Sequence, residues 1–308
     1  MSKARPANGC DGVILLDKPV GLSSNGVLQR VRRLFDGVKA GHTGTLDPQA
    51  SGLLPICLGE ATKFAQGLID SRKRYEAVIR LGWRSSTGDA EGTLTAVSEA
   101  HASDEAVSAC LERFTGELEQ TPPMYSAVKV DGQPLYRLAR RGITLDRAPR
   151  QIFIHELTLL SREADRLTIG VICSKGTYIR TLAEDIGDCL GCGGYLEKLR
   201  RTDVGEFALD GAVTLERLEQ LDSPQRRKLI EPMDALLAGL PALVLTPMSA
   251  RRVGQGQAVC PEQSVPAPGI VRIYVTGGAF LGVGEVGEDG MVRPRRLLTK
   301  VAEPEVNP

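Results

Sequence analysis

The sequence predicts an α+β protein with a large N-terminal domain and a small, β-rich C-terminal domain. Its 308 residues suffice for two domains, and the larger can bury a substantial core. Up to Leu240, short apolar or alternating strands are interspersed with amphipathic helices. Beyond that residue the chain is richer in Gly and Pro and is predicted to form short strands. We therefore expect domains at residues 1–240 and 241–308.

The elements of the large domain are predicted from the spacing of its apolar residues. A buried strand ends in a turn at Pro19, and a helix follows that Ser23 or Ser24 can cap. Another helix opens at Ser103, and a third stops at Gly191. The remaining predictions are strands at 12–18, 53–58, 74–81 and 167–173, helical character at 61–69 and a polar loop at 85–92.

The small domain is predicted to contain strands joined by tight turns. Gly277-Gly278 and the segment 288–290 supply the turn residues. The strands between them span 269–275, 279–286 and 291–298.

A tightly turned loop with the sequence GHTGTLDPQASG, residues 41–52, precedes the strand at 53–58. Three glycines and one proline exclude a helix or a strand there. Asp47 is the only acid between Asp36 and Glu60, and Pro48 biases it toward an extended conformation. We therefore expect one carboxylate, held in one direction.

Composition is typical of a cytosolic protein with reduced thiols. There is no N-terminal apolar run and no stretch near the roughly twenty apolar residues that span a membrane. The 7 Cys include Cys189 and Cys192, which lack a second pair at zinc-site spacing and are interpreted as small hydrophobes near a helix end. The net charge is zero, but arginine-rich clusters permit a local RNA-binding surface at 30–33, 72–74, 137–141 and 200–201.

The loop and three later segments resemble motifs of the TruB family of tRNA pseudouridine synthases. The similar segments are GHTGTLDPQASGLLP followed by GEATK, PPMYSAVK at 122–129 and SKGTYIR at 174–180. The resemblance implies a catalytic domain with a mixed, mainly antiparallel sheet flanked by helices. It also implies an RNA-gripping mobile loop near 121–150 and a PUA-like RNA-binding β-barrel from Pro241.

The resemblance implies an isomerase that converts the uridine at position 55, in the TΨC arm of tRNA, to pseudouridine. This reaction breaks the C1′–N1 bond, turns the base and joins C1′ to C5, so we predict no cofactor and no metal. The resemblance pairs Asp47 with Arg180, stacks Tyr75 on the target base, and places Tyr178 and Leu199 at its pocket. An aspartate beside an arginine is expected to have a lowered pKa.

The sequence leaves open the roles of three further residues and the chemical step that Asp47 performs. His42 could be a general base, but the resemblance implies that it contacts the RNA and helps to hold a flipped nucleotide. Lys18 and Lys63 are candidates for phosphate or structural contacts. The sequence leaves open whether Asp47 adds to the sugar, adds to the base or abstracts a ribose proton.

Two other functions fit part of the sequence. A non-catalytic RNA-binding or tRNA-folding protein would use the same groove, but binding alone requires no set of Asp47, Tyr75 and Arg180. A nucleoside hydrolase would also cleave C1′–N1, but the sequence lacks an Asp-rich, calcium-type cluster. We expect tRNA as the partner, a cytoplasmic location, no membrane contact and no obligate protein partner.

Overall fold

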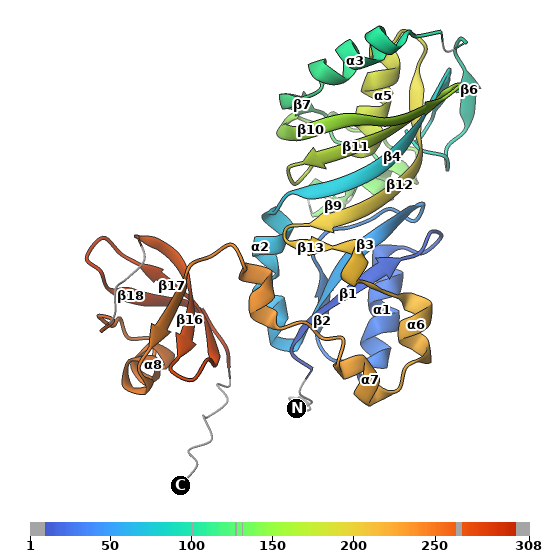
Figure 1. Cartoon of the computed structure of the whole chain (residues 1–308). Helices are drawn as coiled ribbons and strands as arrows, with labels where there is room; N and C mark the ends of the chain where they lie inside the picture. Colours follow the sequence, from blue (N-terminus) through green and yellow to red (C-terminus); the bar gives the residue numbers. More distant parts are fainter. Residues whose placement is uncertain (1–9, 100, 127, 131, 263–266, 300–308) are drawn as a thin grey trace.

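The computed structural model of this protein describes residues 10–99, 101–126, 128–130, 132–262 and 267–299. The large domain is built on a ten-stranded sheet (Figure 1). Its strands are β1 (Gly12–Lys18), β2 (Ala40–His42), β3 (Ala50–Leu58), β4 (Lys73–Leu81), β7 (Gly116–Gln120), β10 (Arg150–Glu163), β11 (Arg166–Cys173), β12 (Gly194–Val204), β13 (Phe207–Ala208) and β14 (Val213–Thr214).

The strand order across this sheet is β14-β1-β3-β12-β4-β11-β10-β7, with β13 beside β12 and β2 beside β3. The pairs β1/β14 and β3/β12 are parallel, and the other pairs are antiparallel. The predicted mixed, mainly antiparallel sheet is therefore confirmed. Because β12 lies between β3 and β4, Arg201 is opposite Gly52 on one side and Tyr75 on the other.

Helices flank the sheet and divide its packing into separate cores. In one core α3 (Asp104–Arg113) and α5 (Ile179–Cys189) pack against strands that include β4, β10 and β11, and in another α1 (Ser24–Leu34) and α6 (Leu215–Gln220) pack against β1 and β3. Figure 1 shows these groups at opposite ends of the large domain. Its other helical segments are η1 (Gly59–Lys63), α2 (Ala65–Asp70), α4 (Leu135–Ala139), η2 (Leu209–Gly211), α7 (Ser223–Arg227) and η3 (Met233–Leu237).

Most local predictions for the large domain are confirmed. The hydroxyls of Ser23 and Ser103 cap α1 and α3, and Gly191 follows α5 with a φ of +74°. The segment 61–69 is a 3₁₀ turn followed by a short α-helix. Cys192 is buried and Cys189 half-buried at the end of α5, both as free thiols. Strands β10 and β12 were not predicted.

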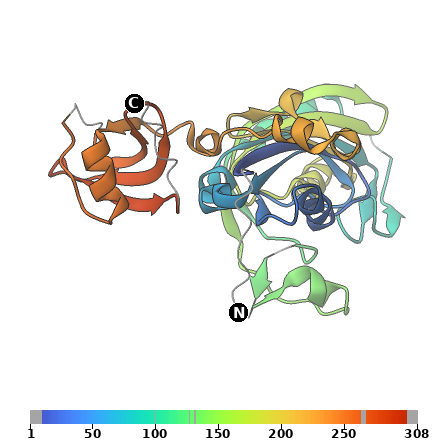
Figure 2. The same cartoon turned by 90° about the horizontal axis from the view of Figure 1, so that it is seen from below.

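The segment 121–150 projects from the body of the large domain (Figure 2). It contains a hairpin of β8 (Lys129–Val130) and β9 (Gln133–Pro134), followed by α4. A second small hairpin, β5 (Trp83–Ser85) and β6 (Leu94–Ala96), flanks the polar loop at 85–92. None of the helices in the described parts of the chain has the length and apolarity needed to cross a membrane.

The C-terminal unit has its own four-stranded sheet and its own core. The strands predicted at 269–275, 279–286 and 291–298 are present within one residue of their predicted bounds. The strand at 242–245 and the helix at 247–254 were not predicted. The elements are β15 (Ala242–Leu245), α8 (Pro247–Gly254), β16 (Gly269–Val275), β17 (Phe280–Val286) and β18 (Val292–Leu297).

Lys63 joins the two units. Its ammonium group donates to the Leu297 carbonyl at 3.1 Å and to the Thr299 hydroxyl at 2.7 Å. The ring of Phe64 packs edge-on against that of Phe280, with centroids 5.4 Å apart. Of the two interpretations given to Lys63, these contacts favour the structural one.

Candidate active site

A pocket of about 380 Å³ opens beside the loop that carries Asp47. Its lining comes from that loop, from β4 and β12, from the junction between β11 and α5, and from the first residues of the 121–150 segment. Five of the six predicted site residues line it, and His42 is not among the lining residues. The five are Asp47, Tyr75, Tyr178, Arg180 and Leu199.

The loop around Asp47 is held on both sides of the carboxylate. Before it, the hydroxyl of Ser24 on α1 donates to the Leu46 carbonyl and accepts from the Leu46 amide, both at 2.8 Å. After it, the Pro48 carbonyl accepts from the amide of Gly21 at 2.8 Å. These contacts agree with one carboxylate held in one direction by a loop that runs from the end of β2 to the start of β3. The expectation that no part of 41–52 is a strand is wrong at both ends, because β2 ends at His42 and β3 begins at Ala50, where the two strands pair with their neighbours in the sheet.

Lys18 is a fully buried part of the same support. Its ammonium group donates to the carbonyls of Pro19 at 2.8 Å, Leu22 at 2.6 Å and Pro48 at 3.4 Å. Burial lowers the pKa of Lys18 to about 8, although the charge of Asp47 acts in the opposite direction. A side chain with no exposed surface cannot meet an RNA phosphate, so we interpret Lys18 as a structural contact.

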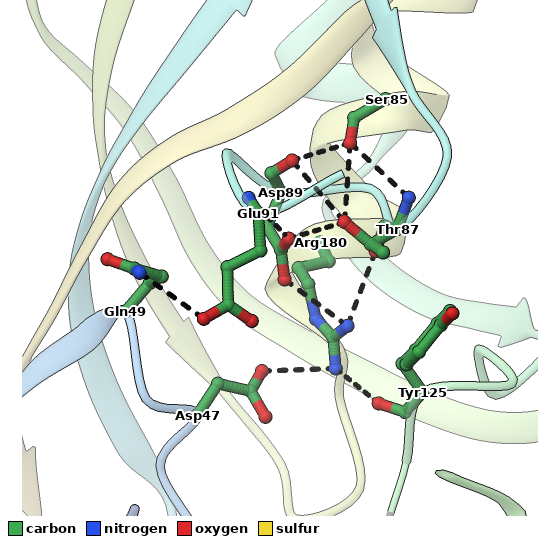
Figure 3. A network of polar contacts seen from close by, with 8 residues as sticks. All are labelled: Asp47, Gln49, Ser85, Thr87, Asp89, Glu91, Tyr125 and Arg180. Carbon is green, nitrogen blue, oxygen red and sulfur yellow. Dashed lines mark hydrogen bonds and ion pairs between the residues drawn. The ribbon is translucent and has the colours of Figure 1, made fainter. Parts of the chain in front are cut away.

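Arg180 forms the centre of a polar network (Figure 3). Its side chain is 6 % exposed, and Nη2 lies 3.0 Å from Oδ2 of Asp47. Nη1 lies 3.4 Å from Oδ2 of Asp89, and Oδ1 of Asp89 accepts from the Thr87 hydroxyl at 2.5 Å. Nη2 also donates to the Tyr125 carbonyl at 2.6 Å. One guanidinium is therefore shared by two carboxylates.

The pKa of Asp47 is raised above its ordinary value, so the predicted lowering is wrong. Burial is the largest cause, and the nearby charges of Asp89 and Glu91 raise the pKa further. Arg180 lowers it, but this guanidinium also faces Asp89. The charge of a shared cation does not offset the lost solvation of a carboxylate. The carboxylate of Asp47 therefore binds a proton more readily than that of an ordinary aspartate.

The first residues of the 121–150 segment form part of the pocket wall. The buried side chain of Gln120 accepts from the Tyr178 amide at 2.7 Å and donates to the Tyr178 carbonyl at 3.1 Å. Ser126 lines the pocket, and its buried hydroxyl has no hydrogen-bond partner among the described residues. Gln120, at the end of β7, thus holds Tyr178, and Tyr125, within the segment predicted to grip RNA, contacts Arg180.

Strands β4 and β12 form the other wall. Tyr75 and Leu199 line it together with two buried cations, Lys73 and Arg201, for which the sequence had indicated no role at the site. Lys73 donates to the carbonyls of Leu68, Ile69 and Ser71, and burial lowers its pKa to about 8. Arg201 likewise donates to the carbonyls of Leu53 and Gly44, so both cations bind main-chain oxygens.

His42 lies on β2, and its Nδ1 is buried without a partner among the described residues. Burial and, to a smaller degree, the charge of Arg201 lower its pKa. The imidazole is therefore neutral at pH 7.

Asp89, Gln120, Ser126 and Arg201 are the site residues that sequence reasoning missed. Asp89 had been placed in the polar loop at 85–92 without a role, and Arg201 in a basic cluster. Ser126 and Arg201 line the pocket, and Asp89 and Gln120 contact Arg180 and Tyr178, which line it. Only their positions after folding indicate these roles.

Three family profiles match nearly the whole chain. One described as "TruB family pseudouridylate synthase (N terminal domain)" matches residues 32–179. One described as "tRNA pseudouridylate synthase B C-terminal domain" matches 180–238, and "Pseudouridine synthase II TruB, C-terminal" matches 241–298.

Similar proteins and structures agree with these profiles. The tRNA pseudouridine synthase B of Aromatoleum aromaticum is 53% identical over 292 residues, which are 95% of this chain and 94% of that protein. That of Azoarcus sp. (strain BH72) is 50% identical, covering 97% of this chain and 98% of its own. A chain in the crystal structure of a Cbf5-Nop10-Gar1 complex superimposes with a TM-score of 0.72 at 27% identity, over 96% of this chain and 87% of its own.

Proposed function

This chain belongs to the TruB family of tRNA pseudouridine synthases, and we propose that it isomerises the uridine at position 55, in the TΨC arm of tRNA, to pseudouridine. The ion pair of Asp47 and Arg180 at 3.0 Å, inside a pocket large enough for a nucleotide base, is the observation that carries the proposal. The relatives' name, tRNA pseudouridine synthase B, supports tRNA as the substrate.

The reaction makes simple demands on the pocket. The C1′–N1 bond breaks, the base turns, and a C1′–C5 bond forms while C5 loses a proton and N1 gains one. We propose that the ionised carboxylate of Asp47 attacks or deprotonates the substrate and that Arg180 holds it. The three routes, addition to the sugar, addition to the base and abstraction of a ribose proton, all require that ionised form. No electrons are exchanged with a cofactor, so none is required.

The target uridine must leave its stack to reach Asp47. Flipping costs a few kcal/mol, and stacking on an aromatic ring returns roughly 1–3 kcal/mol. We propose that Tyr75 supplies this stacking and that Tyr178 and Leu199 bound the same pocket. His42 lies outside the lining, and its neutral ring suits a contact with RNA beside the pocket.

We propose further assignments on the same basis. Residues 1–240 form the catalytic domain, with an RNA-gripping loop near 121–150, and residues 241–308 form a PUA-like RNA-binding domain. The protein acts in the cytoplasm on tRNA, without an obligate protein partner. A purely RNA-folding protein has no use for a carboxylate that opens into a pocket and shares one buried arginine with a second carboxylate, so we place that alternative second.

Tritium release from the substrate tests the proposed reaction. An unmodified tRNA transcript with tritium at C5 of every uridine should lose the tritium of one uridine per molecule. A matched transcript with cytidine at position 55 should lose none. Release from another uridine would contradict the proposed position, and absence of release from both transcripts would contradict the proposed activity.

A further inference from the structure

Arg201 is a buried cation without a carboxylate partner. It is 1 % exposed, and its Nε and Nη2 donate to the carbonyls of Leu53 at 2.8 Å and Gly44 at 3.1 Å. No acidic side chain lies within ion-pair distance among the residues that the structure describes. An arginine keeps its charge at every working pH, and burying an unpaired charge is costly. Such a residue is retained where its charge or geometry serves a function.

Arg201 lies beside Tyr75 in the sheet. In the ladder between β12 and β4, Arg201 is paired directly with Tyr75, and directly opposite residues project from the same face. The charge of Arg201 lowers the pKa of the Tyr75 hydroxyl, while burial, the largest effect, raises it. Both side chains line the pocket that holds Asp47.

The two carbonyl acceptors of Arg201 lie at opposite ends of the loop that carries Asp47. Gly44 precedes Asp47 by three residues, and Leu53 follows it in β3. Between them, Gly52 has a φ of +103°, and a Cβ there would lie 2.2 Å from the backbone oxygen of Arg201. Only glycine allows this approach. The loop therefore contacts both the backbone of Arg201, through Gly52, and the side chain of Arg201, through the carbonyls of Gly44 and Leu53.

We propose that Arg201 is a positioning residue for the isomerisation, in which one guanidinium fixes both ends of the Asp47 loop and holds the Tyr75 hydroxyl toward the uracil ring. The role rests on the proposed function. Its unpaired charge also favours negative charge on the base, which accumulates when the electron pair of the C1′–N1 bond passes to N1. Arg201 thus links the carboxylate that acts on the nucleotide to the aromatic ring beside it.

Two variants of the full-length protein test this role. Arg201→Met removes the charge and the donors, and Arg201→Lys keeps the charge with a different geometry. We expect Arg201→Met to lower kcat by about 100-fold, with tRNA affinity changed by less than about threefold. Arg201→Lys should recover part of the rate. Arg166→Met is the control, because Arg166 pairs with Glu197 at 2.8 Å outside the pocket and should leave kcat unchanged.

Two readouts do not depend on catalysis. With tyrosine labelled at Cζ, the NMR resonance of Tyr75, assigned with Tyr75→Phe, should move in Arg201→Met and stay in Arg166→Met. Amide hydrogen exchange at residues 44–53 should accelerate in Arg201→Met alone. If the wild type releases no tritium, the proposed activity fails, while these readouts still test the positioning.

Two results would overturn the proposal. One is an unchanged Tyr75 resonance and unchanged loop exchange in Arg201→Met. The other is equal losses of rate, tRNA affinity and thermal stability, without any recovery in Arg201→Lys, because a purely structural residue would produce that pattern.

Discussion

The two walls of the pocket carry opposite excess charge. On the carboxylate wall, Asp47 and Arg180 line the pocket and Asp89 lies beside Arg180, so that one guanidinium faces two acids at 3.0 and 3.4 Å. On the sheet wall, formed by Lys73, Tyr75, Leu199 and Arg201, both cations bind backbone carbonyls. The substrate base would lie between a wall with surplus negative charge and a wall with surplus positive charge.

The difference in charge between the two walls suggests that one wall performs the chemistry and the other positions and stabilises the base. The pKa of Asp47 is raised, mainly by burial, and perturbed pKa values are typical of groups that transfer protons, so the carboxylate wall is suited to chemistry. An arginine does not titrate, so Arg201 gives the sheet wall a fixed positive charge and a fixed geometry, whereas burial lowers the pKa of Lys73 to about 8. Removing a charge from either wall should therefore have distinct consequences for rate and for pH dependence.

Among substitutions of the residues around Asp47, Arg180→Met should produce the largest change, because it leaves Asp47 and the buried Asp89 without their shared cation. We expect kcat to fall by about 1,000-fold or more and tRNA affinity to change only slightly, since Arg180 is 6 % exposed and faces carboxylates rather than phosphates. Single-turnover rates and filter binding separate the two quantities. Arg80→Met, which removes a partner of Asp165 outside the pocket, is the matched control. Lost affinity with an unchanged rate would contradict the assignment.

Asp89→Asn should have a smaller effect on rate but shift its pH dependence. The charge of Asp89 raises the pKa of Asp47, so its removal lowers that pKa. The ionised, active form of Asp47 then persists to lower pH. In a plot of kcat/KM against pH, the fall on the acid side should therefore move to lower pH. We expect a rate loss of about tenfold at neutral pH, because Arg180 loses one of its ionic anchors. A shift of this fall to higher pH would show that the two carboxylates are not coupled in this way.

Glu184→Gln should change stability rather than rate. Burial, and then the charge of Asp185, raises the pKa of Glu184 to about 6. An acid whose pKa is raised by folding destabilises the protein above that pKa, and the penalty disappears as pH falls below its unfolded value. The variant should therefore be more stable by about 1 kcal/mol at pH 8 and by almost nothing at pH 4. Urea unfolding at both pH values measures this, with exposed Glu156→Gln as control, and equal gains at both would contradict it.

The sequence predicts best those features that depend only on residues close together in the chain. The caps at Ser23 and Ser103 and the turn at Gly191 depend on neighbours within a few residues, and they are present as predicted. β12 was missed because bulges after Leu196 and Arg201 interrupt the alternation that marks a strand. Without β12, nothing indicates that Arg201 lies beside Tyr75.

The charge balance of the site also depends on long-range packing. The pairing of Asp47 with Arg180 came from the resemblance, and the structure places them 3.0 Å apart. The direction of the pKa shift of Asp47 was wrong, because burial and the position of Asp89 are set by segments distant in sequence. The excess charge of each wall is therefore a property of the fold.

Asp47→Asn tests most directly the claim that the carboxylate wall performs the chemistry. The substitution keeps the size of the side chain and removes its charge. With tRNA tritiated at C5, the variant should bind within a few-fold of wild-type affinity and release no tritium in single-turnover conditions. Asp165→Asn, which alters an ion pair of 2.7 Å at the far end of β4, should release it at the wild-type rate. Wild-type release by Asp47→Asn would contradict the account.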